Sequence, residues 1–206
     1  MFLAGLFAAV LFLGLILGDW LYFVRLTPDA IRYGCGVARS RDQFPSNGMD
    51  RLSRRFDTNG VLSLPHGIAR YYPDLGQIAI RPQYHLFSMS FRTAWPIKGL
   101  IHLSQEATTD SALCVKRIPW SSAIITLVWF LLVSLGTVAF LVVYAVQGGF
   151  NSLTGILMGA GILGIGLLVL AFGVVTVLFS YRLENSRLMK VYSELLAVAD
   201  GAAVTM

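Results

Sequence analysis

The hydrophobic pattern divides the chain into three long apolar segments and one more polar central region. The apolar segments are Leu3 to Val24, Trp120 to Val146 and Leu153 to Tyr181. Each reaches the roughly 20 residues that an α-helix needs to cross about 30 Å of hydrocarbon. From Trp120 to Tyr181 there is no Asp, Glu, Lys, Arg or His, and only a short polar break at 147–152. The pattern therefore predicts an α-helical membrane protein with three transmembrane helices, an N-terminal anchor and a C-terminal helical hairpin.

Between the first two spans, short apolar or alternating runs are separated by Gly, Pro and Asp, a texture typical of β-strands. Because the connections are too short for crossover helices, we expect a small antiparallel β-rich domain built as a meander. At its size this domain buries little core alone, so we expect it to pack on the membrane, the tail or a partner. The expected strands are Val61 to Leu64, Ile68 to Tyr72, Gln77 to Ile80, Tyr84 to Phe91, Leu100 to Leu103 and Leu113 to Lys116.

Three shorter helices are also indicated. Thr27-Pro28-Asp29 has the form of a helix start. A second helix over Asn47 to Phe56 is either a cap on the domain or a basic amphipathic helix on the membrane surface, through Arg51, Arg54 and Arg55. Residues Ser186 to Ala199 carry one apolar stripe and predict a tail helix that continues the third span and ends at Gly201.

Basic residues near the span ends predict the orientation. Arg25 and Arg32 follow the first span, Lys98, Lys116 and Arg117 precede the second, and none lies in the 147–152 turn. By the positive-inside rule the N-terminus is outside and both the central domain and the tail are cytoplasmic, in a bacterial-type inner membrane. The expected parts are helix 1 (1–25), the β-rich domain (26–118), helix 2 (119–147), an extracytoplasmic turn (148–152), helix 3 (153–181) and the amphipathic tail (182–206).

Composition agrees with this class, since 56% of residues are hydrophobic. The net charge of +5 is explained by topology and by attraction to anionic lipids, with no need for nucleic acid. In the cytoplasm Cys35 and Cys114 would stay reduced. In the inverted orientation they could form a disulfide across the domain.

Small residues recur every seven positions along the third span and form a continuous stripe suited to close helix packing in lipid. The stripe either faces the second span within the hairpin or docks on another subunit, the latter helped by Gly161 and Gly164 on other faces. The residues at this spacing are Ser152, Gly159, Gly166, Gly173 and Ser180, and Gly155 and Thr176 extend the stripe one turn along.

The first span has its own small-residue motif, Gly14-x-x-x-Gly18, which predicts a further helix contact. Asp19 is the one acid within an apolar span. Roughly 9 Å inside Arg25, it is either an interfacial carboxylate or one half of an ion pair with a neighbouring subunit.

Candidate chemistry is sparse. The sequence shows no Gly-x-Ser-x-Gly elbow and no phosphate-binding glycine loop, and its acids are scattered, so no enzyme is predicted. His66, His85 and His102 lack metal-ligand spacing, and we expect no metal site. We expect no cofactor bound by this chain's own ligands, only apolar contacts to lipids or to pigments and cofactors of neighbouring subunits.

These features favour a non-catalytic accessory subunit of a larger integral membrane complex, whose partners are other membrane subunits and anionic lipids. The outside N-terminus, single span and cytoplasmic β-rich domain are similar, in topology alone, to the H subunit of bacterial photosynthetic reaction centres, although the C-terminal hairpin departs from it. That similarity adds photosynthetic and respiratory assemblies to the hosts considered. The alternative is a membrane-anchored module whose β domain binds anionic lipid or a peptide.

Overall fold

The computed structural model describes residues 22, 25–43, 48–83, 93, 95–106 and 109–201. The chain forms two compact units. One, here called the β domain, combines Met1–Ser122 with Tyr181–Met206, and the other, the apolar hairpin, is Ala123–Ser180. The C-terminal tail thus belongs to the same unit as the central region, although the hairpin separates them in the sequence.

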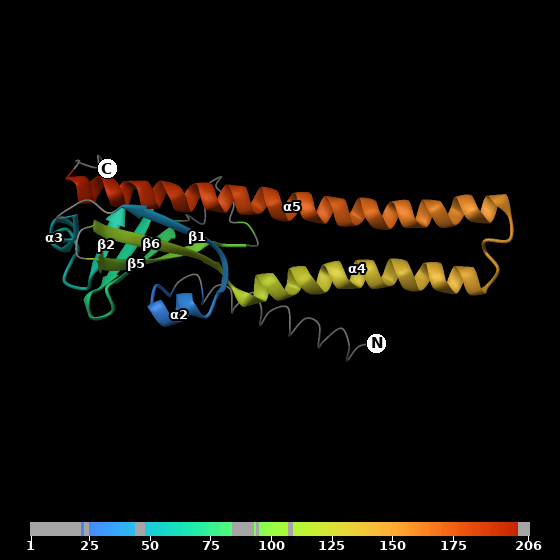
Figure 1. Ribbon diagram of the computed structural model, residues 1–206, viewed down its shortest axis with the longest axis horizontal. Coiled ribbons are helices and arrows are strands. Elements are labelled where there is room, and N and C mark those ends of the chain that lie inside the picture. Colours follow the sequence, from blue (N-terminus) through green and yellow to red (C-terminus); the bar gives the residue numbers. More distant parts are fainter. Residues whose placement is uncertain are drawn as a thin grey trace. The chain divides into compact units, whose positions relative to one another are not determined.

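A six-stranded, fully antiparallel sheet forms the centre of the β domain (Figure 1). Its order is β1-β6-β5-β4-β3-β2, so β2 to β6 make the predicted meander and β1 adds to it beside β6. The predicted strands at Val61, Ile68, Gln77, Leu100 and Leu113 are confirmed. The strands are β1 (Cys35–Gln43), β2 (Val61–Leu64), β3 (Gly67–Tyr72), β4 (Gln77–Pro82), β5 (Lys98–Glu106) and β6 (Thr109–Ile118).

Strand β1 is the element that the sequence did not predict. Gly36 and two arginines, Arg39 and Arg41, interrupt its apolar pattern, and the register with β6 shifts between Gly36 and Ala38. Charged side chains and a bulge are common on edge strands, where they discourage pairing with other chains. The predicted strand from Tyr84 to Phe91 lies outside the described residues.

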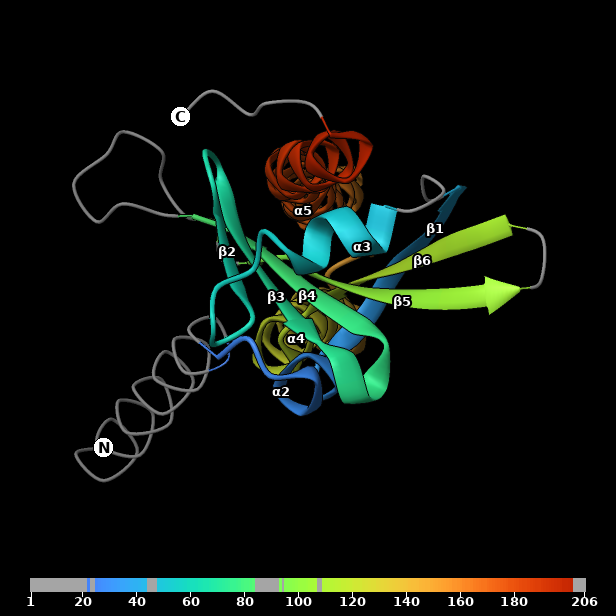
Figure 2. The same ribbon diagram turned by 90° about the vertical axis from the view of Figure 1, so that its left-hand side faces the viewer.

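The C-terminal part of α5 (Leu153–Asp200) covers one face of the sheet. Most of its apolar stripe is buried: Leu188 and Leu195 are 0% exposed and Tyr192 is 2% exposed, while Leu196 is partly buried against the same core. These side chains form one core with Ile78, Ile80, Ile101, Ala112 and Cys114 of the sheet. Figure 2 shows α5 and the short α3 (Gly48–Ser53) on the same side of the strands. The tail therefore completes the core that the meander alone lacks.

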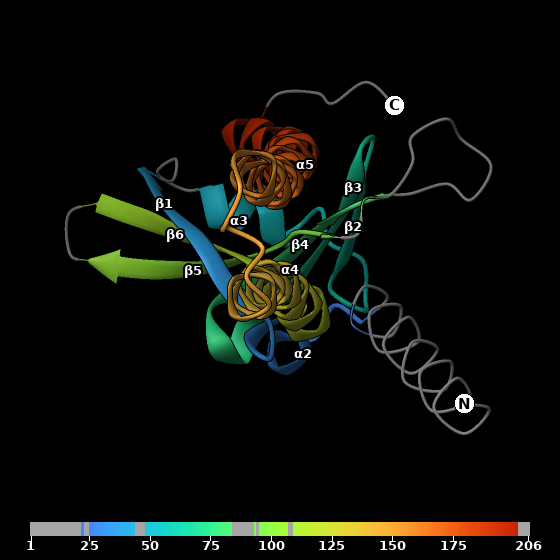
Figure 3. The same ribbon diagram turned by 90° about the vertical axis from the view of Figure 1, so that its right-hand side faces the viewer.

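The opposite face of the sheet packs on the segment that precedes β1. Helix α2 (Pro28–Arg32) begins at Thr27, whose hydroxyl accepts a hydrogen bond from the Ala30 amide, as the sequence predicted. Leu26 and Ile31 pack there on Ala79 and Leu100. Figure 3 shows α2 on the side of the sheet away from α3 and the end of α5.

Helix α3 packs on the β domain beside the C-terminus of α5. Leu52 is fully buried, and Met49 and Phe56 pack on the same core. The Arg51 guanidinium donates to the Asp200 carbonyl at 2.7 Å, where α5 ends at Gly201 with a φ of 88°. Helix α3 thus caps the core of the β domain, which is one of the two roles predicted for it.

The hairpin consists of α4 (Trp120–Val146) and the N-terminal part of α5, joined by residues 147–152. Within the described part of the chain, two helices, α4 and α5, are long and apolar enough to cross a membrane. Both begin where the sequence predicted spans, and α5 continues beyond Tyr181 into the tail without a break. The predicted first span, apart from Tyr22, lies outside the described residues.

We expect Leu195→Ala to destabilise the β domain by about 2–5 kcal/mol, because it leaves a cavity between α5 and the sheet. Leu183→Ala is the matched control, since Leu183 is on the same helix and 38% exposed. Pulse proteolysis in a urea series, with the full chain in mild detergent, measures both. Equal effects of the two substitutions would show that tail docking does not hold the domain together.

Candidate functional site

The best-defined polar arrangement lies at the end of the sheet where β6 leads into α4. Lys116 and Arg117 are adjacent in β6 and therefore point to opposite faces. Lys116 Nζ donates to Asn185 Oδ1 of α5 at 2.8 Å. Arg117 Nη1 donates to the carbonyls of Arg32 and Gly34, each at 2.7 Å. Two neighbouring cations thus hold the tail on one face and segment 25–34 on the other.

Lys98 strengthens the second attachment. Its side chain is 0% exposed, and Nζ donates to the Arg25 carbonyl at 2.6 Å and lies 4.2 Å from the centre of the Tyr22 ring. A carbonyl and an aromatic face together compensate a buried ammonium group, which would otherwise be very costly. The Tyr72 hydroxyl also donates to the Leu26 carbonyl at 2.6 Å. Polar bonds therefore fix the whole path of the chain as it enters the domain.

Acidic residues of α5 hold the tail on the other face. Glu184 is 0% exposed, and its Oε1 accepts from the Thr93 amide and from Arg187 Nη1, both at 3.1 Å. Glu194 Oε2 accepts from the His66 amide in the β2–β3 turn, and its other oxygen contacts His66 Nδ1. The bonds to Thr93 and His66 could not be predicted from the sequence, since they join positions far apart in the chain, whereas Glu184 and Arg187 are three residues apart on one helix.

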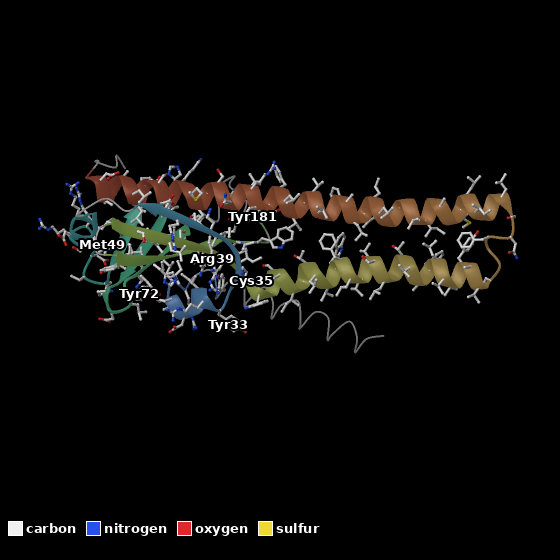
Figure 4. All side chains as sticks on the ribbon, viewed as in Figure 1. Tyr33, Cys35, Arg39, Met49, Tyr72 and Tyr181 are labelled. Carbon is white, nitrogen blue, oxygen red and sulfur yellow. The ribbon has the colours of Figure 1, made fainter. Side chains whose placement is uncertain are left out.

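Exposed positive charge remains at the same end of the sheet. Arg25 and Arg32 are exposed, and Tyr33 is 74% exposed. Burial, together with the nearby guanidinium groups of Arg32 and Arg117, lowers the pKa of His102. The lowered pKa favours neutral His102, and the exposed positive charge at this end comes from arginines. In Figure 4, Tyr33 and Cys35 lie at this end of the domain and Met49 at the other.

The small-residue stripe lies inside the hairpin. A Cβ added to Gly166 would meet Thr137 of α4 at 2.6 Å, and one added to Gly173 would overlap Trp129. A Cβ on Gly159 would overlap Phe150 and one on Gly155 the Gly149 carbonyl, both in the connecting turn. The four glycines of the stripe thus face α4 and the connecting turn.

The other predicted site residues that the structure describes lie in the connecting turn, in the hairpin and beside α3. Ser152 Oγ accepts from the Gly155 amide at 3.1 Å, and Ser180 is 7% exposed. Gly136, Gly161 and Gly164 have open space where a Cβ would stand. Arg54 and Arg55 are exposed beside α3. Gly14, Gly18 and Asp19 lie outside the described residues.

The positions of the two cysteines rule out the disulfide considered for the inverted orientation. In the register of the sheet Cys35 pairs with Ile118, whereas Cys114 pairs with Ser40. The two are therefore separated by roughly 13 Å along the strands, beyond the reach of a disulfide. Both thiols are free, so the disulfide suggested for an inverted orientation cannot form within the chain.

The histidines are separated as well. His66 lies at the β2–β3 turn, His102 contacts Gln77 on β4 across 3.3 Å, and His85 is outside the described residues. Over the described ranges, no three His, Cys, Asp or Glu residues gather closely enough to hold a metal ion.

No family model, curated protein or solved structure matches the chain. The class of protein is therefore defined by the structure alone, as an antiparallel β domain joined to a hairpin of two long apolar helices.

We expect Gly166→Leu to lower the melting temperature of the hairpin by several degrees, because the added side chain enters the space of Thr137. Gly161→Leu is the control, since the same substitution on the same helix meets open space. Circular dichroism of both variants in detergent makes the comparison. Equal destabilisation by Gly161→Leu and Gly166→Leu would contradict the packing of the small-residue stripe on α4.

Burial raises the pKa of the Cys114 thiol to about 11. Since the folded state favours the protonated thiol, this group should cost stability as the pH rises from about 9 to about 11. At pH 8 we expect maleimide to label Cys35 in the folded chain and both thiols only after denaturation. Mass spectrometry counts the labels, and Cys35→Ser should leave the folded chain unlabelled. Rapid native labelling of that variant would contradict the buried position of Cys114.

Proposed function

We propose that this chain is a non-catalytic subunit of a larger integral membrane complex, with its hairpin in the bilayer and its β domain against the cytoplasmic surfaces of other subunits. The observation that carries the proposal is the outer surface of the hairpin. Leu132, Leu168 and Phe172 are 66–71% exposed there, and no ionisable residue interrupts them. An apolar surface of this extent is typical of contact with lipid or with other membrane helices.

The open glycines favour partner helices over lipid alone. Gly136, Gly161 and Gly164 present backbone at the hairpin surface with no neighbour within 4 Å. In lipid, close approach of helix backbones through small residues is a main source of packing energy. Because the seven-residue stripe is already used within the hairpin, these three glycines are the positions through which a second subunit would pack.

The polar groups of the β domain support a structural role. Its buried charged residues Lys98, Lys116 and Glu184 each hold one chain segment on another. Such groups are satisfied by fixed partners, whereas catalytic acids and bases need access to a substrate. A second candidate function, recognition of anionic lipid by the β domain, is supported by the exposed Arg25 and Arg32.

Co-purification tests the subunit proposal. After extraction into native nanodiscs, we expect the tagged chain to elute with other membrane proteins in a particle larger than the monomer. The combined Gly136→Leu, Gly161→Leu and Gly164→Leu variant should release the chain from that particle, since bulky side chains prevent close helix approach.

Ala139→Leu with Ala171→Leu is the control, because both alanines are exposed on the same helices and bulk there should be tolerated. A wild-type chain that elutes alone, as a stable monomer, would overturn the proposal.

A further inference from the structure

The chain enters and leaves the apolar hairpin at one end of the sheet. Trp120 follows Arg117 by three residues and so lies at most about 11 Å from it, given the reach of an extended chain. On the other side, Lys116 binds Asn185, and Arg182 is one turn earlier on α5. Bonds from Arg117 and Lys98 place Arg25 and Arg32 at this same end. Basic residues of three chain segments thus lie at the end of the β domain beside the start of α4, with Arg25 and Arg32 on one face of the sheet and Arg182 on the other.

These arginines are available to a ligand. Arg25, Arg32 and Arg182 are exposed, and none takes part in an ion pair with a carboxylate among the described residues. Of the acids nearby, Glu184 is buried and bound by Thr93 and Arg187, and Asp29 is exposed at the first turn of α2. Exposed positive charge therefore exceeds exposed negative charge at this end of the β domain.

Exposed aromatic residues accompany the arginines. Tyr33 is 74% exposed and Trp120 is 47% exposed. Tyr and Trp are enriched at the level of lipid headgroups, and basic side chains beside a membrane attract anionic lipids by about 1 kcal/mol each. Guanidinium groups also suit phosphate, which they bind through two parallel hydrogen bonds.

We propose that Arg25, Arg32 and Arg182, flanked by Tyr33 and Trp120, bind the headgroups of anionic phospholipids around this end of the β domain. We call these five residues the arginine collar. The inference rests on the proposed insertion of the hairpin in a bilayer, but it does not depend on membership of a larger complex. Binding would fix the height of the β domain at the membrane surface, since all three arginines lie next to the points where the chain meets the apolar helices.

Native mass spectrometry of the purified full chain in detergent tests the site. With equal amounts of phosphatidylglycerol and phosphatidylcholine added, we expect several-fold more bound phosphatidylglycerol. The variant Arg25→Gln, Arg32→Gln and Arg182→Gln should abolish this preference. Replacing the same three residues by Lys should retain most of it, because the charge is kept.

The matched control is Arg39→Gln, Arg54→Gln and Arg55→Gln, which removes the same charge from exposed positions outside the collar. It should keep the wild-type preference. Pulse proteolysis shows whether each variant is folded, and the Lys variant gives a folded comparison if the Gln variant is not.

Equal binding of the two lipids by the wild-type chain would overturn the proposal, as would loss of the preference in both Gln variants alike. So would a collar variant that keeps its lipid preference but loses a co-purifying protein, which would assign the collar to an acidic protein surface. A chain that elutes as a monomer yet shows the expected lipid preference would refute the subunit function and leave the collar standing.

Discussion

Burial of the α5 stripe against the sheet is the contact on which the β domain depends. Leu188, Tyr192 and Leu195 come from a helix that begins in the apolar hairpin, and they form one core with side chains of the sheet and with Leu52 of α3. Each large apolar side chain buried in this way contributes about 1.5–3 kcal/mol. A small six-stranded sheet with one face open to water would lose most of that energy. The central region and the tail are therefore one folding unit, interrupted by the hairpin.

Charged groups determine where the surrounding segments attach to that unit. Lys98 and Arg117 bind carbonyls of segment 25–34, while Lys116, Glu184 and Glu194 hold α5. Each bond satisfies a group that would be costly to bury alone. The same arrangement leaves the side chains of Arg25 and Arg32 pointing to solvent, although their carbonyls are used as acceptors. Structural attachment and the proposed lipid site thus share one short segment without competing for the same atoms.

The hairpin combines a closed face and an open face. Gly166 and Gly173 are fitted against α4, whereas Gly161 and Gly164 meet nothing. The seven-residue periodicity identified Gly166 and Gly173 as part of a packing stripe. It could not show whether the stripe packs on α4 or on a helix of another subunit, because both require small residues. Only the three-dimensional pairing of Thr137 with Gly166 and of Trp129 with Gly173 decides it.

Local rules predicted much of the fold. Apolar length gave α4 and α5, alternation and turn residues gave β2 to β6, and Gly201 marked the end of the tail. Strand β1 was missed because its arginines and glycine break the alternation, and pairing with β6 stabilises it nonetheless. Lys98 was identified only as a positive charge near a span, since nothing nearby in the sequence indicates its acceptor, the Arg25 carbonyl.

Local sequence patterns are enough to predict the apolar segments, strands β2 to β6 and the regions of concentrated positive charge, because these properties depend on neighbouring residues. Tertiary contacts determine which surfaces cover one another: the tail on the sheet, the stripe on α4, and β1 on β6. Such contacts join residues far apart in the chain, and their energy depends on complementary shape and charge that no local pattern records.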